Sequence, residues 1–410
     1  MKYKKRKTLR NIILASVITI AILAMVVCLN DFDDTLAVLQ KANGTYIWYS
    51  IVFVLAYFIL YPIPLCMLTK HINKDAKFWR IYIIGTTEHF FNDITPFATG
   101  GQPFQAYEMK KTGVPVHQST GILLMNYIVF MLVTNTFAII SLYFYQRFTA
   151  NISNLTWIVI IGFSINFLVL VLFFVMAYSR HFREGSIRLI LKITRNKKKI
   201  KEKGEKEALK VEEYFASAQD AAQELLKSPF LLISTFLIKA VTMAIYYAIP
   251  FFIIMAMVAN LSPNYLDECY QNLFYIMAAT SFASTIVVWV PTPGASGGIE
   301  FAFQKIFSTV PGITSAIAMS SMLIWRLITY YGVAILSCLG YFISERISAS
   351  LDVRYINVED EKNDDENDGS NNKEQLTDEE KEKLFEYNKK ISENELKMKK
   401  LIKRGAKNEE

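Results

Sequence analysis

The sequence predicts an all-α, polytopic integral membrane protein with inverted repeats and two re-entrant helices that are broken by proline and glycine. Three features predict this fold: long apolar segments, basic residues beside them, and one Pro/Gly cluster in each half of the chain. Of the 410 residues, 52% are hydrophobic, and the 20% that are charged gather in a few blocks. A spanning helix needs about 20 mostly apolar residues, because each rises about 1.5 Å through a core about 30 Å thick. Several apolar segments meet that requirement.

The first apolar segment, Asn11 to Leu29, follows a strongly basic start. A signal peptide also begins with basic residues, but its apolar core is shorter and ends at small residues suited to cleavage. The residues Cys28-Leu29-Asn30 offer no such site. The segment is therefore predicted to be an uncleaved membrane anchor.

Five further apolar segments complete a set of six predicted crossings. They are Tyr46–Leu68, Ser119–Gln146, Leu155–Tyr178, Pro229–Val258 and Ile313–Ile343. Lys and Arg in short loops mark the cytoplasmic side of a membrane protein. Basic residues gather at the N-terminus and in the stretch Arg180 to Lys210, whereas acidic residues gather at Asp31 to Asp34 and at Asp267 and Glu268. Both termini are therefore predicted to face the cytoplasm.

Composition argues against several other classes of protein. The net charge of +7 lies mainly in loops that flank apolar segments, so no nucleic-acid partner is expected. Cys28, Cys66 and Cys338 lie inside apolar segments, and only Cys269 lies in a predicted loop. Neither a Cys-x-x-Cys spacing nor a Cys/His cluster is present, so we expect no disulfide framework, no metal and no cofactor.

Two stretches do not fit simple spans. Trp79 to Met109 contains the cluster Thr95-Pro96-Phe-Ala-Thr-Gly100-Gly101-Gln102-Pro103, and Tyr270 to Val310 contains Pro291-Thr-Pro293-Gly294-Ala-Ser296-Gly297-Gly298. Proline removes a backbone donor and glycine lowers helix stability, so each cluster is predicted to end one half-helix and start another. Unwound backbone at membrane depth is tolerated only where it is buried in protein or lines a wet cavity.

The two broken stretches are predicted to enter from opposite faces of the membrane, one in each half of the chain. This arrangement is typical of an inverted repeat with a central binding site, and it indicates transport. The alternative is that both clusters are ordinary loops between helices, because Pro and Gly are also the commonest loop residues.

Ionisable residues inside apolar segments are candidates for function, because each costs about 2.5 to 3.5 kcal/mol to insert. The candidates are Glu88, His89, Asp93, Lys239, Glu300, Lys305 and Arg326. Glu300 falls in the first turn of a predicted half-helix, where the helix dipole favours an anion, and Arg326 lies midway along the last span. We expect the two to approach each other, with the guanidinium holding a phosphate on its other side. A closed structural ion pair is the equal alternative.

The remaining ionisable candidates each have two interpretations. Lys239 either contacts the substrate or snorkels or pairs within the protein. Glu88 and Asp93 either neutralise a cationic headgroup or carry protons, or they pair with Lys or Arg inside the protein. His89 belongs to the same possible charge relay.

The two clusters offer a second device for binding a phosphate, through half-helix N-termini whose backbone N–H groups point at an anion. Gly100-Gly101 and Gly297-Gly298 would let a ligand approach the chain closely. The alternative is that these glycines serve only tight helix packing. The candidate binding residues of the clusters are Thr95, Pro96, Gly100, Gly101, Gln102, Pro293, Gly294, Ser296, Gly297 and Gly298.

One short match indicates an enzyme. Gly294-Ala-Ser296-Gly297 has the Gly-x-Ser-Gly form of rhomboid intramembrane proteases, whose nucleophilic serine needs a histidine from a later helix. All four histidines, His71, His89, His117 and His181, precede Ser296, so we predict no serine-protease chemistry and no catalytic residues. The chain also lacks a His-Glu-x-x-His sequence, a Walker loop and a dinucleotide fingerprint.

Residues 1–346 are predicted to form the transmembrane domain, with a basic cytoplasmic loop at 180–228 that contains a helix from Glu205 to Leu226. Residues 347–410 are predicted to form a charged cytoplasmic tail, which consists of a disordered linker and a helix from Thr377 to Arg404. That helix either binds a cytoplasmic partner or the anionic membrane surface, or it is a solvated helix with no specific role. A homo-oligomer also stays possible.

The two Gly-rich clusters, together with Glu300 and the pair Trp325-Arg326, resemble those of the lysylphosphatidylglycerol synthase transmembrane family. This family comprises the flippase portion of multiple peptide resistance factors and its stand-alone relatives in Gram-positive bacteria. The likeness covers about Lys7 to Arg346. It implies a flippase in the bacterial cytoplasmic membrane whose substrate is a membrane lipid, either a phospholipid such as aminoacylated phosphatidylglycerol or a polyprenyl-linked lipid.

Two departures from that family bear on function. Many members carry a Glu-Arg pair just after the first cluster, whereas this chain has Met125-Asn126-Tyr127, which affects the choice of substrate. Full-length relatives append a soluble aminoacyl-transferase domain that uses charged tRNA. About sixty-five hydrophilic residues follow the last predicted span, fewer than the roughly 100 of a typical domain. The alternatives are an enzyme of aminoacyl-lipid synthesis, of the phosphatidylglycerol lysyltransferase type, and a membrane scaffold.

Overall fold

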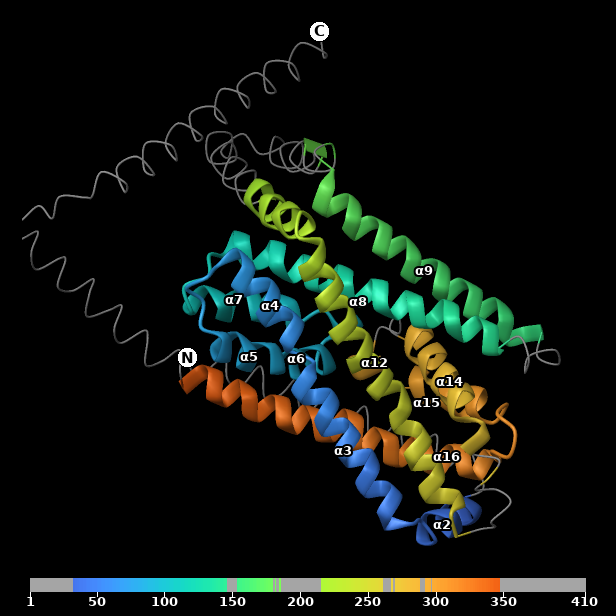
Figure 1. The fold of residues 1–410 in the computed structure, drawn as a ribbon. Coiled ribbons are helices and arrows are strands. Elements are labelled where there is room, and N and C mark those ends of the chain that lie inside the picture. Colours follow the sequence, from blue (N-terminus) through green and yellow to red (C-terminus); the bar gives the residue numbers. More distant parts are fainter. Residues whose placement is uncertain are drawn as a thin grey trace, which may run out of the picture. The chain divides into compact units, whose positions relative to one another are not determined.

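The computed structural model describes residues 32–145, 153–179, 215–260, 270–287, 292–295 and 297–346, together with a few isolated positions. The described residues form helices and turns and contain no strand, in agreement with the predicted all-α class (Figure 1). The helices up to residue 179 and from residue 229 onward belong to one compact unit. The predictions for the anchor Asn11–Leu29, for most of the loop at 180–228 and for the tail at 347–410 lie outside the described residues.

Five described segments are long and apolar enough to cross a membrane, which confirms five of the predicted crossings. They are Gly44–Ile72, Val116–Phe144, Ile161–Tyr178, Pro229–Val258 and Ser315–Arg346. Each overlaps its predicted segment, and Pro229–Val258 matches it at both ends. The agreement follows from the length of the apolar runs, because hydropathy over a window of about 19 residues is a local property of the sequence.

These segments contain the long helices of the fold. α3 (Gly44–Leu60) and α4 (Ile63–Ile72) share the first segment, and α8 (Val116–Tyr145), α9 (Ser153–Tyr178) and α12 (Pro229–Val258) contain the next three. The last contains α16 (Ser315–Arg326), the π-helical stretch η4 (Leu327–Gly332) and a helical run to residue 346. α12 contacts α3, α4, α8 and α16, so it is the central helix, and α8 and α9 run side by side (Figure 1).

Both Pro/Gly clusters interrupt helices, as predicted. The first broken segment runs through α5 (Phe78–Thr86), α6 (Glu88–Asp93), the 3-10 turn η1 (Pro96–Ala98) and α7 (Gly101–Lys111). The second runs through α14 (Leu273–Val287), the 3-10 turn η3 (Pro293–Ala295) and α15 (Gly298–Phe307). A short helix α2 (Phe32–Gln40) precedes α3 and contacts α16.

The apolar core has two large parts that a small aromatic cluster joins. One large part packs α4, α5, α7, α8 and α9 together, and the other packs α12, α14, α15 and α16 together. Phe130 packs against the first part and Tyr246 against the second, and both also pack against the small cluster. The small cluster contains Tyr57, Tyr61, Val133, Met243 and Tyr247.

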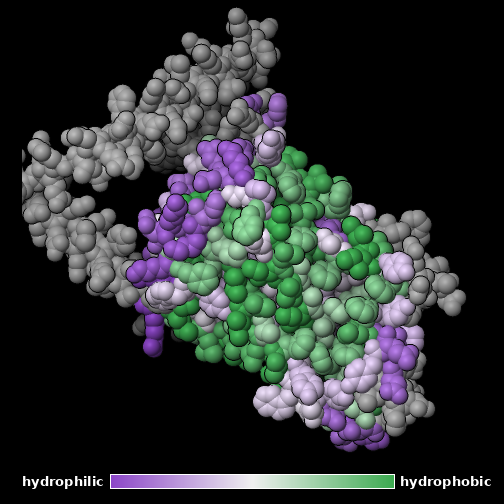
Figure 2. All heavy atoms as spheres, viewed as in Figure 1, coloured by the Kyte–Doolittle hydropathy of each residue, from purple (hydrophilic) through white to green (hydrophobic). Residues whose placement is uncertain are grey.

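Apolar side chains also cover much of the outer surface. Figure 2 shows a broad hydrophobic band across the visible face, with hydrophilic side chains gathered toward its ends. Many large apolar residues are exposed in the middle of the spans, among them Val52, Ile59, Leu237 and Val241. A patch of this size is a liability in water but is the required surface in a lipid bilayer. The chain is therefore a multi-pass membrane protein.

Candidate functional site

A cavity of about 300 Å³ lies where the two broken segments meet. The turns η1 and η3 contact each other there, and the cavity wall contains Asp93 and Phe97 from one segment and Gly294 and Ala295 from the other. α3, α8, α12 and α16 supply much of the remaining wall. The two Pro/Gly clusters, far apart in the chain, therefore share one chamber.

The two clusters share a local sequence pattern and a left-handed turn. Thr95-Pro96-Phe97-Ala98 corresponds to Thr292-Pro293-Gly294-Ala295, and a Gly-Gly pair follows each one after a single Thr or Ser. Phe97 and Ala98 have φ of 56° and 51°, and Gly294 and Ala295 have φ of 59° and 52°. Residues other than glycine rarely adopt this left-handed conformation, and the strain is typical of functional sites. The repeated Thr-Pro-x-Ala pattern is visible in the sequence but was missed there.

Side chains of the first broken segment hold its own break together. The Thr95 hydroxyl donates to the Phe91 carbonyl at 2.8 Å and accepts a hydrogen bond from the Gly100 N–H at 2.9 Å. The Asn92 side-chain oxygen accepts one from the Gly101 N–H at 2.9 Å. A Cβ atom at Gly101 would lie 2.7 Å from Asn92, so the glycine permits this close approach. These first N–H groups of α7 are thus already bound by the protein.

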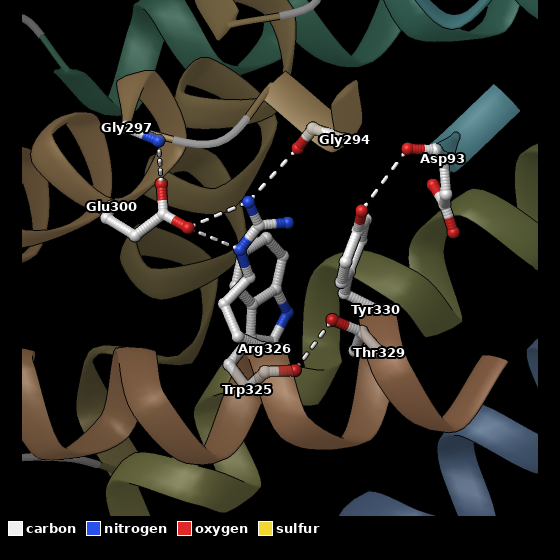
Figure 3. Close-up of polar contacts among 8 residues, drawn as sticks. All are labelled: Asp93, Gly294, Gly297, Glu300, Trp325, Arg326, Thr329 and Tyr330. Carbon is white, nitrogen blue, oxygen red and sulfur yellow. Dashed lines mark hydrogen bonds and ion pairs between the residues drawn. The ribbon is translucent and has the colours of Figure 1, made fainter. Parts of the chain in front are cut away.

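An acidic and a basic side chain hold the second break together (Figure 3). The Glu300 carboxylate accepts a hydrogen bond from the Gly297 N–H at 2.7 Å, which caps α15. Its other oxygen accepts from Nε of Arg326 at 2.8 Å and lies 2.8 Å from Nη2, so these two side chains meet as expected. Nη2 also donates to the Gly294 carbonyl at 3.0 Å. Glu300 is fully buried and Arg326 is nearly so.

Tyr330 joins the two breaks. Its hydroxyl donates to the Asp93 carbonyl at 3.2 Å, at the end of α6, and its ring lies 4.6 Å from the Arg326 guanidinium carbon. A Cβ atom at Gly294 would overlap the same ring. Tyr330 lies in the π-helical stretch η4, and such wide turns often occur at functional sites. Figure 3 shows the Tyr330 ring beside the guanidinium, with its hydroxyl toward Asp93.

Lys239 of α12 lies in the cavity wall and is only 1% exposed. Its Nζ lies 4.2 Å from the centre of the Tyr61 ring and 5.9 Å from that of Phe130. The ammonium and the Glu88 carboxylate attract each other. Among the described residues, none forms a hydrogen bond with Nζ or an ion pair with it within 4 Å.

Glu88, His89 and Asp93 all lie in the cavity wall on α6. Glu88 is buried and accepts a hydrogen bond from Gln105 at 3.3 Å, and His89 shares one with the Tyr57 hydroxyl at 3.3 Å. The Asp93 carboxylate makes no hydrogen bond and no ion pair within the described part of the chain. Asp93 is therefore an acidic group of the cavity without a bonded partner in that part.

The cavity gathers six of the predicted site residues. Glu88, His89, Asp93, Lys239, Gly294 and Arg326 line it. Glu300 lies behind Arg326, while Thr95, Gly100, Gly101 and Gly297 take part in the breaks. Gln102 and Gly298 belong to α7 and α15 and are outside the lining. The side chains of Pro96, Pro293 and Ser296 lie outside the described part of the structure.

Sequence reasoning did not assign the aromatic, amide and hydroxyl residues of the wall to the cavity. They include Tyr57, Tyr61, Asn126, Tyr127, Phe130, Thr134, Asn166, Tyr246, Tyr247 and Trp325. The signal that identifies some of them is spacing, because residues four apart share a helix face: Asn126, Phe130 and Thr134 on α8 follow this rule. Asn126 is one of the residues that replace the Glu-Arg pair of many relatives, and its buried side-chain oxygen has no hydrogen-bond partner among the described residues.

The cavity lies near the middle of the spans. At about 1.5 Å per residue, Asn126 and Lys239 lie about 15 Å from the first residues of α8 and α12. Arg326 lies about 17 Å from the first residue of α16 by the same measure. Half the thickness of the hydrocarbon core is about 15 Å. Asn126, Lys239 and Arg326 are therefore distant from both ends of the membrane spans that contain them.

The comparison with known proteins agrees with the resemblance. The family model described as Lysylphosphatidylglycerol synthase TM region matches residues 12–337. The match includes both broken segments and every described residue of the cavity wall from Tyr57 to Tyr330. No curated protein sequence matches the chain.

Proposed function

The chain belongs to the lysylphosphatidylglycerol synthase transmembrane family, and we propose that it moves a phospholipid across the membrane through the central cavity. Membership of this family and the membrane-spanning fold assign it a lipid-related role. The headgroup of a phospholipid cannot cross the hydrocarbon core easily, because each charged group there costs several kcal/mol. A protein that moves such a lipid must give the headgroup a polar path at that depth.

A single observation carries the proposal: the two breaks meet at one cavity with ionisable walls in the middle of the spans. Transporters with inverted repeats bind their substrates near the bilayer midplane, at discontinuous helices. Two broken segments with the same Thr-Pro-x-Ala sequence and the same left-handed turn support such a repeat. In this proposal both segments are re-entrant, and the cavity opens to each side in turn while the acyl chains stay in the lipid.

The balance of charges favours a headgroup that carries an amine. Glu300 is paired with Arg326, whereas the Asp93 carboxylate at the cavity wall forms no hydrogen bond and no ion pair with a described residue. A substrate ammonium beside Asp93 would supply the missing positive charge and up to three hydrogen-bond donors. Aminoacylated phosphatidylglycerol combines a phosphate with such an ammonium. We therefore propose an aminoacylated phospholipid as substrate, in the bacterial cytoplasmic membrane and with both termini in the cytoplasm.

Purified protein in liposomes tests the proposal directly. The measurement is the rate at which fluorescent lysyl-phosphatidylglycerol in the inner leaflet becomes accessible to an external quencher. We expect the protein to raise this rate above that of empty liposomes. Asp93→Asn keeps the shape of the side chain but removes its charge, so the rate should fall about tenfold or more, the size of one charge-assisted hydrogen bond.

Lys305→Gln is the matched control, because Lys305 is exposed and outside the cavity wall. This variant should transport like the unchanged protein. Folded protein that moves labelled lipid no faster than empty liposomes contradicts the proposed function. An Asp93→Asn variant with unchanged preference for lysyl-phosphatidylglycerol over phosphatidylglycerol contradicts only the proposed headgroup.

A further inference from the structure

We propose that Lys239 is the residue that binds the phosphate of the lipid, and that Arg326 instead holds the second break together. The inference rests on the proposed function, because it assigns a phosphate ligand within the same cavity. It reverses the order of the two candidates from the sequence, in which Arg326 was the expected phosphate ligand and Lys239 was open to either interpretation.

Lys239 has an ammonium with unused donors at the cavity wall. The side chain is 1% exposed and lines the cavity, and no described residue makes a hydrogen bond with Nζ. An ammonium has three N–H donors, and each can bind an oxygen of an anion in the cavity. A phosphate in the cavity would supply acceptors for these donors.

Two neighbouring groups attract the charge of Lys239 without occupying its donors. The ring of Tyr61 lies 4.2 Å from Nζ, and a cation over an aromatic face is attracted by the electrons of the ring. Glu88 attracts the ammonium but forms no ion pair with it within 4 Å, and its carboxylate already accepts a hydrogen bond from Gln105. Tyr61 and Glu88 thus attract the ammonium, while its donors stay available to a ligand in the cavity.

Arg326 is in the opposite situation. Its Nε and Nη2 lie 2.8 Å from one oxygen of Glu300, Nη2 also donates to the Gly294 carbonyl, and Tyr330 lies against the guanidinium. Each of these contacts joins Arg326 to η3, α15 or η4. A phosphate that took these donors would release the Gly294 carbonyl and the Glu300 carboxylate inside the protein, which is unfavourable for buried polar groups. The geometry therefore assigns Arg326 to the structure of the break.

A binding measurement in detergent separates the two assignments. The probes are dihexanoyl phosphatidylglycerol, dihexanoylglycerol, which lacks the phosphate, and inorganic phosphate, which lacks the lipid. Isothermal titration calorimetry gives the affinity for each. The unchanged protein should bind the phospholipid more tightly than dihexanoylglycerol. Lys239→Gln should lower the affinity for the phospholipid about tenfold or more and leave the affinity for dihexanoylglycerol unchanged. Lys305→Gln should bind like the unchanged protein, because Lys305 lies outside the cavity wall.

A second variant controls for misfolding as the cause of lost binding. Lys239→Met with Glu88→Gln removes both charges together, so no buried charge is left without its opposite. The double variant should melt near the temperature of the unchanged protein and still bind the phospholipid weakly. Lys239→Arg should restore much of the affinity, because it returns the charge and the donors. Free phosphate that binds as tightly as the phospholipid would identify a phosphate site in place of a lipid site and overturn the proposal.

The outcome for Lys239 is separable from the outcome for transport. A Lys239→Gln variant that keeps its full preference for the phosphate-bearing lipid overturns the assignment, even if the unchanged protein moves lipid in liposomes. Conversely, a Lys239→Gln variant that loses this preference supports the assignment. That conclusion holds even if the unchanged protein moves no labelled lipid, a result that would contradict only the proposed function.

Discussion

At the level of single residues, Gly294 shows how closely the two breaks are fitted together. It has φ of 59°, it accepts a hydrogen bond from Arg326, and it lies against the Tyr330 ring. An L side chain at this position meets two obstacles, the left-handed backbone and the ring itself. Tyr330 in turn reaches Asp93 of the other break, so a change at Gly294 is expected to affect both.

Gly294→Ala should lower the stability of the protein by about 1 to 3 kcal/mol, because its Cβ atom overlaps the Tyr330 ring in a packed site. Thermal melting in detergent measures the effect. Gly44→Ala is the matched control, since no atom lies within 4 Å of a Cβ placed there. Adding Tyr330→Leu to Gly294→Ala should cost less than the sum of the two single changes. Equal melting temperatures for Gly294→Ala and Gly44→Ala would contradict the close contact between Gly294 and the Tyr330 ring.

At the level of elements, each half-helix after a break starts with its first N–H groups bound by a side chain. Thr95 and Asn92 do this for α7, and Glu300 does it for α15. Helix starts leave several N–H groups without partners, and a buried start needs side-chain acceptors. The breaks are thus stable turns held by specific side chains, and these side chains come from the neighbouring residues of the chain.

Thr95→Val keeps the size of the side chain but removes the acceptor for the Gly100 N–H and the donor to the Phe91 carbonyl. We expect a loss of about 1 to 3 kcal/mol, because two partly buried backbone groups lose their partner. Thr95→Ser, which keeps the hydroxyl, should stay close to the unchanged protein. Chemical denaturation in a mixed detergent measures both, and a Thr95→Val variant as stable as the unchanged protein would contradict the role of the hydroxyl.

At the level of the whole molecule, the long helices separate a lipid-facing surface from a central cavity. Val241 and Met243 illustrate this on α12: Val241 is 54% exposed on the outside, whereas Met243 is 4% exposed and lines the cavity. The two residues lie at nearly the same depth, because two residues advance a helix by only about 3 Å. A wet cavity is therefore expected to make them chemically different.

A cysteine at position 243 should react with a membrane-impermeant thiol reagent, whereas one at position 241 should not, because the thiolate that reacts forms only in contact with water. The starting protein has Cys28, Cys66, Cys269 and Cys338 replaced by serine. Mass spectrometry of protein in liposomes counts the modified chains for Met243→Cys and Val241→Cys. Short-chain phosphatidylglycerol should slow the reaction at position 243 only. Equal reaction at both positions contradicts a separate wet cavity.

Local patterns predicted much of this architecture. Five crossings could be located because each is an apolar run that alone satisfies the thickness of the bilayer. The contact between Glu300 and Arg326 was also predicted, because two opposite charges at similar depth in an apolar medium have few other partners. The aromatic and amide wall was not predicted, because Tyr57, Asn126 and Tyr246 come from three different helices whose packing no local pattern records.

The membrane class, the positions of the spans and the two breaks follow from hydropathy and from the backbone chemistry of proline and glycine, which act within a few turns of one chain segment. Tertiary packing decided which charged groups have partners. Arg326 meets Gly294 only because η3 lies close to the end of α16, and Lys239 lies beside the Tyr61 ring only because α3 and α12 pack together. Hydrogen bonds reach about 3 Å, so their formation depends on the relative placement of whole helices.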